Sequence, residues 1–249
     1  MPTQPYRTKN GKRVPGVTTI LSRFKDSGGL IWWANRLALE PLLQARHLLD
    51  LATTNGDGTW KDDAVKFLAI DPARWDHKLE ASRAADAGTA AHAMFDAFVR
   101  KIEFDPSEFT PVQLEMARPA FEAGKEWATQ SRFEVVETEV SLVSEKHRFG
   151  GTRDGILVSG RRAIGDVKTS RDIYPEMLLQ LAAYGLLDEE HGNTIDGGYH
   201  ILKFSKQDKP EDPVRFGHFY FSQLDAARRA FLLCRELYGL MQDIEKLTK

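Results

Sequence analysis

A tight hairpin in the middle of the chain constrains the fold more than any other feature of the sequence. Two apolar strands are expected at residues 150–158 and 163–169, and Ser159-Gly160-Arg161 forms a tight connection between them. A connection this short pairs two strands antiparallel. The chain therefore contains a sheet, and the segments on either side of the hairpin decide what covers it.

The hydrophobic pattern changes its period near residue 131. Apolar residues before this point recur at helical spacing, whereas residues 133–143 alternate, with Val136 on the apolar face and Glu137 on the polar one. Further strands are expected at residues 199–204 and 215–221. Helices are expected to begin at Val14 and Leu30 and to cover residues 81–99, 111–130, 174–187 and 223–246.

This order of elements predicts one α/β domain over residues 1–249. A chain of 249 residues is within reach of one such domain. We expect a helical layer at residues 14–130, a sheet core at 131–222 and a closing helix at 223–249.

The bulk composition narrows the functional classes. No stretch approaches the roughly 20 consecutive apolar residues of a membrane-spanning helix, and residues 1–10 lack the apolar core of a secretory signal, so a cytoplasmic location is expected. The formal net charge of −2 weakens a role as a passive DNA-coating protein, but it does not count against an enzyme that acts on nucleic acid, whose carboxylates would offset its basic residues. The single cysteine, Cys234, is too few for a disulfide framework, a cysteine zinc site or an iron–sulfur cluster.

Two aspartates and a lysine fall on the strands of the hairpin. Asp166 and Lys168 are two residues apart, so both project to one side of their strand, with Val167 buried opposite. The antiparallel pairing can bring Asp154 beside Asp166. Two carboxylates close together are costly unless a cation lies between them, and Mg²⁺ or Mn²⁺ suits oxygen ligands.

A metal-dependent phosphodiester hydrolase needs this arrangement. The metal polarises a phosphoryl oxygen and lowers the pKa of a bound water, and a second metal can stabilise the leaving oxygen. The ammonium group of Lys168 could position the water and stabilise charge in the transition state. An Asp-x-Lys pair on an exposed strand face can also occur by chance, but the apolar strand around it and the neighbouring Asp154 favour a site.

Four motifs in this order resemble a known family. Asp154, the run Asp166-Val-Lys168, Gln180-Leu-Ala-Ala-Tyr184 on the next helix and Gly88-Thr-Ala-Ala-His92 on an upstream helix are similar to motifs of the RecB-type branch of the PD-(D/E)XK nucleases. That branch includes the mitochondrial genome maintenance exonuclease, the CRISPR-associated adaptation exonucleases and many phage exonucleases. The resemblance runs from residue 14 to about residue 220, and the opening of the chain resembles phage-encoded members.

The resemblance implies a fold and a set of roles. The fold would be a restriction-endonuclease-like core, a mixed central sheet flanked by helices, with a helical N-terminal layer. Gln180 and Tyr184, one helical turn apart, would orient the catalytic lysine or contact the DNA backbone. One or two Mg²⁺ or Mn²⁺ ions would be held by His92, Asp154, Asp166 and the carbonyl of Val167, with Lys168 as the catalytic lysine.

The implied activity is exonuclease action on linear DNA ends or single strands, in a bacterial host cell if the chain is phage-encoded. Several relatives hold an iron–sulfur cluster through four cysteines, so the cluster-free members are the closer comparison. Members of this branch usually have a glutamate at this position of the third strand; this chain has Asp166, which keeps the carboxylate. Two alternatives are a structure-specific endonuclease on the same fold and a non-catalytic DNA-binding subunit; the complete set of two acids and a lysine argues against the second.

Other polar side chains near the predicted site are candidates for substrate binding, because phosphate contacts come mostly from Arg and Lys. They are Arg153, Thr169, Ser170 and Arg171, with Glu139 at the rim. Taken singly, each arginine could equally be a solvated charge. Trp32 and Trp33 could stack on bases, although core packing is expected for at least one of them because successive helical positions face different ways.

Overall fold

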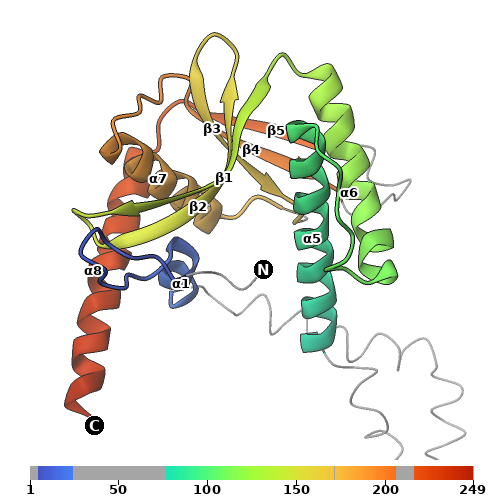
Figure 1. The fold of residues 1–249 in the computed structure, drawn as a ribbon. Coiled ribbons are helices and arrows are strands. Elements are labelled where there is room, and N and C mark those ends of the chain that lie inside the picture. Colours follow the sequence, from blue (N-terminus) through green and yellow to red (C-terminus); the bar gives the residue numbers. More distant parts are fainter. Residues whose placement is uncertain (1–4, 25–76, 171, 206–215, 249) are drawn as a thin grey trace, which may run out of the picture. The chain divides into compact units, whose positions relative to one another are not determined.

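A five-stranded sheet is the central element of the part of the chain that the structure describes (Figure 1). The structure, a computed structural model, describes residues 5–24, 77–170, 172–205 and 216–248. The strands lie in chain order across the sheet: β1 (Glu134–Ser144), β2 (Phe149–Val158), β3 (Arg162–Lys168), β4 (Tyr199–Phe204) and β5 (Phe216–Phe221). Neighbouring strands are antiparallel except β3 and β4, which are parallel.

Helices cover both faces of this sheet (Figure 1). The described helices are α1 (Val17–Ser22), α5 (His77–Arg100), α6 (Pro111–Gln130), α7 (Pro175–Glu190) and α8 (Asp225–Leu247). Since α7 carries the chain from the end of β3 back to the start of β4, these two strands run parallel. The predicted mixed α/β class is thus confirmed. Of the described helices, none is both long enough and apolar enough to cross a membrane.

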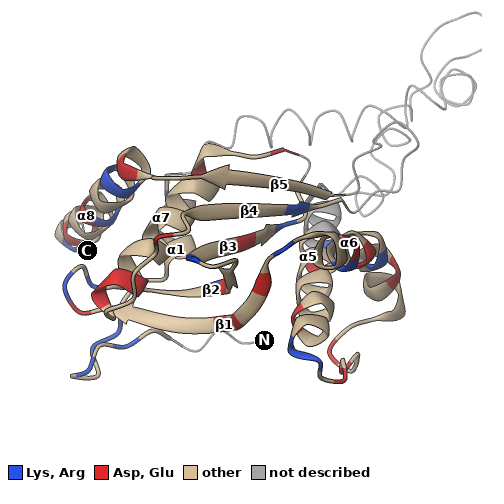
Figure 2. Ribbon diagram, turned by 90° about the horizontal axis from the view of Figure 1, so that it is seen from above, with Lys and Arg blue, Asp and Glu red and all other residues tan. Residues whose placement is uncertain are grey.

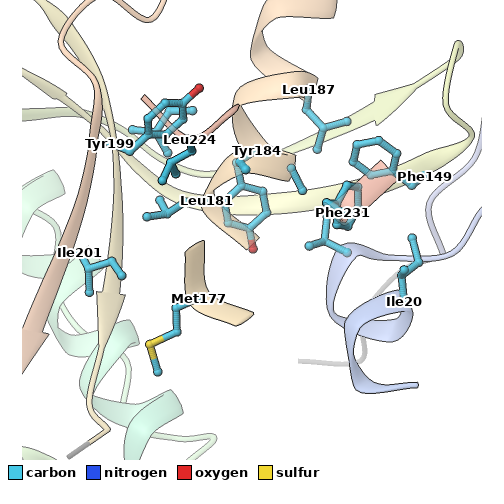
Figure 3. Close-up of a cluster of buried hydrophobic side chains, with 14 of the residues drawn as sticks. Ile20, Phe149, Met177, Leu181, Tyr184, Leu187, Tyr199, Ile201, Leu224 and Phe231 are labelled. Carbon is cyan, nitrogen blue, oxygen red and sulfur yellow. The ribbon is translucent and has the colours of Figure 1, made fainter. Parts of the chain in front are cut away.

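The two faces have separate hydrophobic cores. On one face, α1, α7 and α8 bury Leu181 and Phe231 (Figure 3). Ile156 of β2 belongs to the same cluster. On the other, α5 and α6 bury Phe95 and Trp127 against Leu157. The successive residues Ile156 and Leu157 of β2 are therefore buried in different cores, because side chains in a strand alternate between the two faces of the sheet.

The chain divides into two compact units, one formed by Met1–Lys25 with Ala87–Lys249 and the other by Asp26–Asp86. The sheet belongs to the first unit. Nearly all of the second lies outside the described residues, and so do the helix expected from Leu30, the pair Trp32 and Trp33, and Arg171. The single domain over residues 1–249 stays a prediction.

The first helix begins later than its sequence pattern indicates. It was expected from Val14 but starts at Val17, because the preceding residues pair with β2. The carbonyl of Pro15 accepts a hydrogen bond of 3.0 Å from the backbone N–H of Gly150, and Gly16 forms a parallel bridge with the same residue. A tertiary contact 135 residues along the chain thus sets where α1 begins.

The alternation expected in β1 is interrupted. A bulge shifts the register with β2 between Val135 and Glu137, and Val136 is consequently 45% exposed rather than on the apolar face. Glu139 also adopts a left-handed backbone conformation, with φ of 52°. The prediction of a regular alternating strand was therefore wrong in the first half of β1.

Gly150 provides space for the ring of Tyr6, which reaches Thr152 with its hydroxyl at 2.9 Å. A Cβ at position 150 would overlap the near end of the Tyr6 side chain, which cannot move without losing this hydrogen bond. Gly150→Ala is expected to lower the free energy of unfolding by about 1–3 kcal/mol, as overpacking commonly does. Urea unfolding of Gly150→Ala, alone and combined with Tyr6→Ala, measures this. An equal loss in both backgrounds would contradict the assigned contact.

A chain of hydrogen bonds joins α6 to the far strands of the sheet. The indole N–H of Trp127 donates to Nδ1 of His218 at 3.2 Å, so the N–H of neutral His218 is at Nε2. This Nε2 lies 2.7 Å from Nδ1 of His200, whose Nε2 lies 3.3 Å from the carbonyl of Gly197. All three contacts are satisfied at once only when both imidazoles are neutral.

The stability of the protein should therefore fall in mild acid. Burial and the neighbouring His200 lower the pKa of His218 to about 4, below its value of roughly 6.5 in an unfolded chain. As pH falls from 6.5 towards 4, the unfolded chain takes up the proton first, so this contribution to stability is present above pH 6.5 and is lost below it. Allowing for part exposure, we expect a loss on the order of 1–2 kcal/mol between pH 7 and 5. Urea unfolding of wild type and His218→Gln at both pH values isolates the effect, and equal pH dependence would refute it.

Candidate active site

The candidate site lies where β2 and β3 part. Their ladder is paired as far as Gly155 and Gly165, and Asp154 is the next residue of β2. Beyond this point a side chain, rather than the backbone, joins the two strands. Oδ2 of Asp154 accepts a hydrogen bond of 2.7 Å from the backbone N–H of Val167. The carboxylate is thus fixed between the two strands, with 19% of its side chain still exposed.

Asp166 and Lys168 project from the adjoining end of β3. As predicted from strand alternation, both are on one side, and Val167 is buried in the opposite core. Asp166 is fully buried and its Oδ2 forms an ion pair with the ammonium group of Lys168. Within the described part of the chain, Oδ1 of Asp166 has no hydrogen-bond partner.

Two side chains of α7 hold the lysine from the other direction. The Nζ of Lys168 donates to Oε1 of Gln180 at 3.0 Å, and Nε2 of Gln180 donates to the hydroxyl of Tyr184 at 2.7 Å. Because the amide is anchored at both ends, the ammonium group has a defined position between Gln180 and Asp166. The expected role of Gln180 in orienting Lys168 agrees with this geometry, whereas Tyr184 is only 3% exposed and is not placed to contact a DNA backbone.

Burial, neighbouring charges and hydrogen bonds set the pKa values of these groups. Burial raises the pKa of Asp166 to about 6; Lys168 opposes this rise and Asp154 adds to it. Burial also raises the pKa of Asp154, against Lys168 and the N–H of Val167. Burial alone would lower the pKa of Lys168, but the two carboxylates outweigh it and raise that pKa. Lys168 is therefore a cation at neutral pH, between carboxyl groups that favour additional positive charge.

Helix α5 and strand β1 border the site on the opposite face of the sheet. Nδ1 of His92 lies 3.6 Å from Oδ2 of Asp154. Asp96 and Glu139 line the same small pocket as these two residues. Although Glu139 is exposed on one side, partial burial and the carboxylates of Asp154, Asp96 and Asp166 raise its pKa to about 7. Figure 2 shows acidic positions on β1 and β3 in the region of the sheet near α5.

Asp96 is the member of this group that sequence analysis missed. It follows His92 by four residues and so lies on the same side of α5. The four-residue spacing from His92 was the one sequence signal that could have indicated a place for Asp96 near the site. An aspartate on an amphipathic helix is common, however, and only the tertiary structure shows that this one lines the pocket. Oδ2 of Asp96 forms an ion pair of 3.1 Å with Arg100 on the same helix, and this contact is a structural role for Asp96.

The donor set suits a hard divalent cation held by two carboxylates. Asp154 and Asp166 are adjacent, and a buried oxygen of Asp166 lacks a hydrogen-bond partner among the described residues. Over the same residues, no three His, Cys, Asp or Glu side chains converge where they could hold one metal ion. Mg²⁺ commonly uses one or two carboxylates, with water and substrate oxygens as its other ligands.

The expected substrate-binding role of Arg153 is corrected. Its side chain is 2% exposed and points to α7, where Nε donates to the buried Asp188 at 2.9 Å, and it also pairs with Glu137. Since these carboxylates hold it inside the protein, Arg153 is not available to a phosphate. Thr169 and Ser170 directly follow β3 and are half-buried, so they stay near the site.

Comparisons with known proteins give distant likenesses. No family model matches the chain, and no curated protein matches it. Among solved structures, the alkaline exonuclease of Laribacter hongkongensis is similar over 51% of this chain and 70% of its own, with 16% identity and a TM-score of 0.32. The protein SSO0001 is similar over 55% of this chain and 68% of its own, with 14% identity and a TM-score of 0.32. Likenesses at this level show neither a family nor an activity for this chain.

Proposed function

We propose that this chain is a metal-dependent deoxyribonuclease that hydrolyses phosphodiester bonds. The observation that carries the proposal is the fixed ammonium group of Lys168, held between Asp166 and Gln180 beside the second carboxylate, Asp154. A lysine that served only to neutralise one buried aspartate would not need an amide anchored on α7. A cation positioned beside two carboxylates at the end of a strand is suited to phosphoryl chemistry.

Asp154 and Asp166 are the proposed ligands of an Mg²⁺ or Mn²⁺ ion, and the unpartnered oxygen of Asp166 supports this. The carbonyl of Val167 is proposed as a further ligand. The imidazole of His92, whose Nδ1 lies 3.6 Å from Oδ2 of Asp154, is proposed to join them after a movement of its side chain, because no three His, Cys, Asp or Glu side chains converge among the described residues. When bound, the ion polarises a phosphoryl oxygen and lowers the pKa of a water molecule. Carboxylates with raised pKa values favour an added positive charge, which is consistent with a divalent ion at this position.

The residues of the chain have distinct tasks in this proposal. Lys168 stays protonated, because the carboxylates beside it raise its pKa, so it donates hydrogen bonds to phosphate oxygens rather than accepting a proton. Its charge stabilises the negative charge that develops on the phosphate. Gln180 and Tyr184 keep the ammonium group in position. Thr169 and Ser170 follow Lys168 in the chain and are proposed substrate contacts, although the hydroxyl of Ser170 donates to the carbonyl of Asp172 at 2.9 Å. The proposed substrate is DNA, at linear ends or in single strands, and the proposed location is the cytoplasm.

Cleavage of three DNA forms tests this function. Purified protein is incubated with end-labelled linear duplex, single-stranded and covalently closed circular DNA, with Mn²⁺, Mg²⁺ or a chelator. We expect degradation of a linear form with either ion, none with the chelator and an intact circle. Cut circles would favour a structure-specific endonuclease on the same residues. Metal-independent binding without cleavage would overturn the proposal in favour of a non-catalytic DNA-binding subunit.

Gln180→Leu is expected to lower the cleavage rate by about ten- to a hundredfold, because the ammonium group of Lys168 loses the acceptor that fixes it. Single-turnover rates at saturating DNA report this loss in kcat, with little change in KM. Tyr184→Phe is the matched control, since it removes only the hydroxyl that holds the far side of the amide. It should have a smaller effect. A Gln180→Leu enzyme with the wild-type rate would show that the contact is structural only.

A further inference from the structure

Helix α8 has a stripe of exposed aliphatic residues on its outer face. The stripe consists of Leu233, Leu237, Leu240, Ile244 and Leu247, which are 65%, 45%, 52%, 52% and 86% exposed. Exposed single leucines are common, but five on one face of one helix are not. Their exposure is not explained by the proposed active site, which α8 does not border.

The stripe is distinct from the side of α8 that holds the helix in place. Phe231 is fully buried, and Cys234 and Tyr238 pack against the core shared with α1 and α7. These residues lie on the side of the helix that faces the core, and the stripe points away from it. From Gln242 to Thr248 every residue is exposed. The second half of α8 accordingly runs on past α1 in Figure 1.

The spacing of the stripe is that of a coiled coil. Its members are separated by four, three, four and three residues, a repeat of 3.5 residues that keeps a helix in contact with a second helix along its length. In heptad terms Leu233, Leu240 and Leu247 occupy the d positions, and Leu237 and Ile244 occupy the a positions. Leucine at d with a β-branched residue at a favours a parallel pair of helices, and of the two a positions Ile244 meets this condition.

We propose that α8 pairs in parallel with α8 of a second copy of this chain. The charges beside the stripe support this direction. Glu236 and Asp243 are at the g positions, and in an antiparallel pair Glu236 would face Asp243 of the other copy. In a parallel pair they face Met241 and Thr248 instead, so like charges do not meet.

The area of the stripe is sufficient for a dimer of modest affinity. Each side chain offers roughly 100 Å² of apolar surface, so two copies would bury roughly 1,000 Å² in total, close to the lower limit for a specific interface. Helix α8 is already formed and anchored at Phe231, so pairing does not have to nucleate a helix. We therefore expect reversible dimers in the micromolar range.

Sedimentation equilibrium of the full-length protein tests the pairing. Wild type should be a concentration-dependent dimer, and Leu240→Glu/Ile244→Glu should weaken association by at least about a hundredfold because it would bury four carboxylates in the dimer. The control Gln242→Glu adds charge on the side of α8 away from the stripe and should dimerise like wild type. Circular dichroism verifies that the variants stay folded. A wild-type monomer at 100 μM, or a dimer unaffected by the double variant, would overturn the proposal.

The direction of pairing is tested by cross-linking. In a Cys234→Ser background, Leu233→Cys should form a disulfide-linked dimer on mild oxidation, because Leu233 is at one end of the stripe and meets its own copy only in a parallel pair. Gln242→Cys in the same background is the control and should cross-link far less. A dimer by sedimentation that fails to cross-link at position 233 would refute the parallel arrangement.

Discussion

Lys168→Ala should lower the rate of DNA cleavage by about a thousandfold, because it removes the fixed positive charge that faces the phosphate in the transition state. The ammonium group is held in a defined position by Asp166 and Gln180. The effect should be on kcat rather than on DNA affinity, since one buried cation contributes little to binding of a long polyanion. Single-turnover cleavage with saturating Mn²⁺ measures it.

Two controls separate this loss from misfolding. Asp166 can take up a proton once its counter-ion is gone, so Lys168→Ala should keep the circular dichroism spectrum of wild type. Lys125→Ala removes a half-buried lysine of α6 that pairs with Glu122 and lies over the ring of Phe121, and it should leave the rate unchanged. If Lys168→Ala cleaves within threefold of wild type, Lys168 is not the catalytic lysine.

Asp154→Asn has the second large expected effect, a loss of at least about a hundredfold in activity with nearly unchanged stability. The amide oxygen of Asn can still accept the hydrogen bond from the N–H of Val167, so the junction between β2 and β3 stays closed. The loss of one anionic ligand weakens the hold on a divalent ion. Activity should therefore recover in part as Mn²⁺ is raised, which a metal titration of the cleavage rate would show.

Asp154→Ala is the informative comparison. It removes the acceptor as well as the charge, so the N–H of Val167 loses its partner and the free energy of unfolding should fall by about 1–3 kcal/mol. Urea unfolding of both variants separates the structural contribution from the chemical one. Full activity of Asp154→Asn at low Mn²⁺ would contradict the assignment of Asp154 as a ligand.

Local periodicity explains how much of the fold was predictable. The sheet strands and the helices α6, α7 and α8 were placed within a few residues, because each buries one regular face. Asp166 and Lys168 were expected on one side of β3 for the same reason, and the structure agrees. The position of Gln180 beside Lys168 was not derivable from spacing. It was expected from the motif order alone.

The remaining features depend on contacts between distant segments. Asp154 reaches the site because the β2–β3 ladder stops at Gly155, and strand periodicity does not show where a ladder stops. Arg153 looked like a free cation beside the site, but its partner Asp188 is 35 residues away on α7. The bulge before Glu137 likewise reverses the face of Val136, which a regular pattern could not indicate.

The central claim is that Asp154 and Asp166 hold the metal ion of a nuclease whose lysine is Lys168. Its most direct test is a crystal structure of the protein soaked in Mn²⁺ with a short single-stranded oligonucleotide, with anomalous diffraction to locate the metal. The account predicts an anomalous peak bonded to carboxylate oxygens of both aspartates, with a DNA phosphate in contact with the ion and with Nζ of Lys168. A protein that cleaves DNA with its only Mn²⁺ bound elsewhere would contradict it.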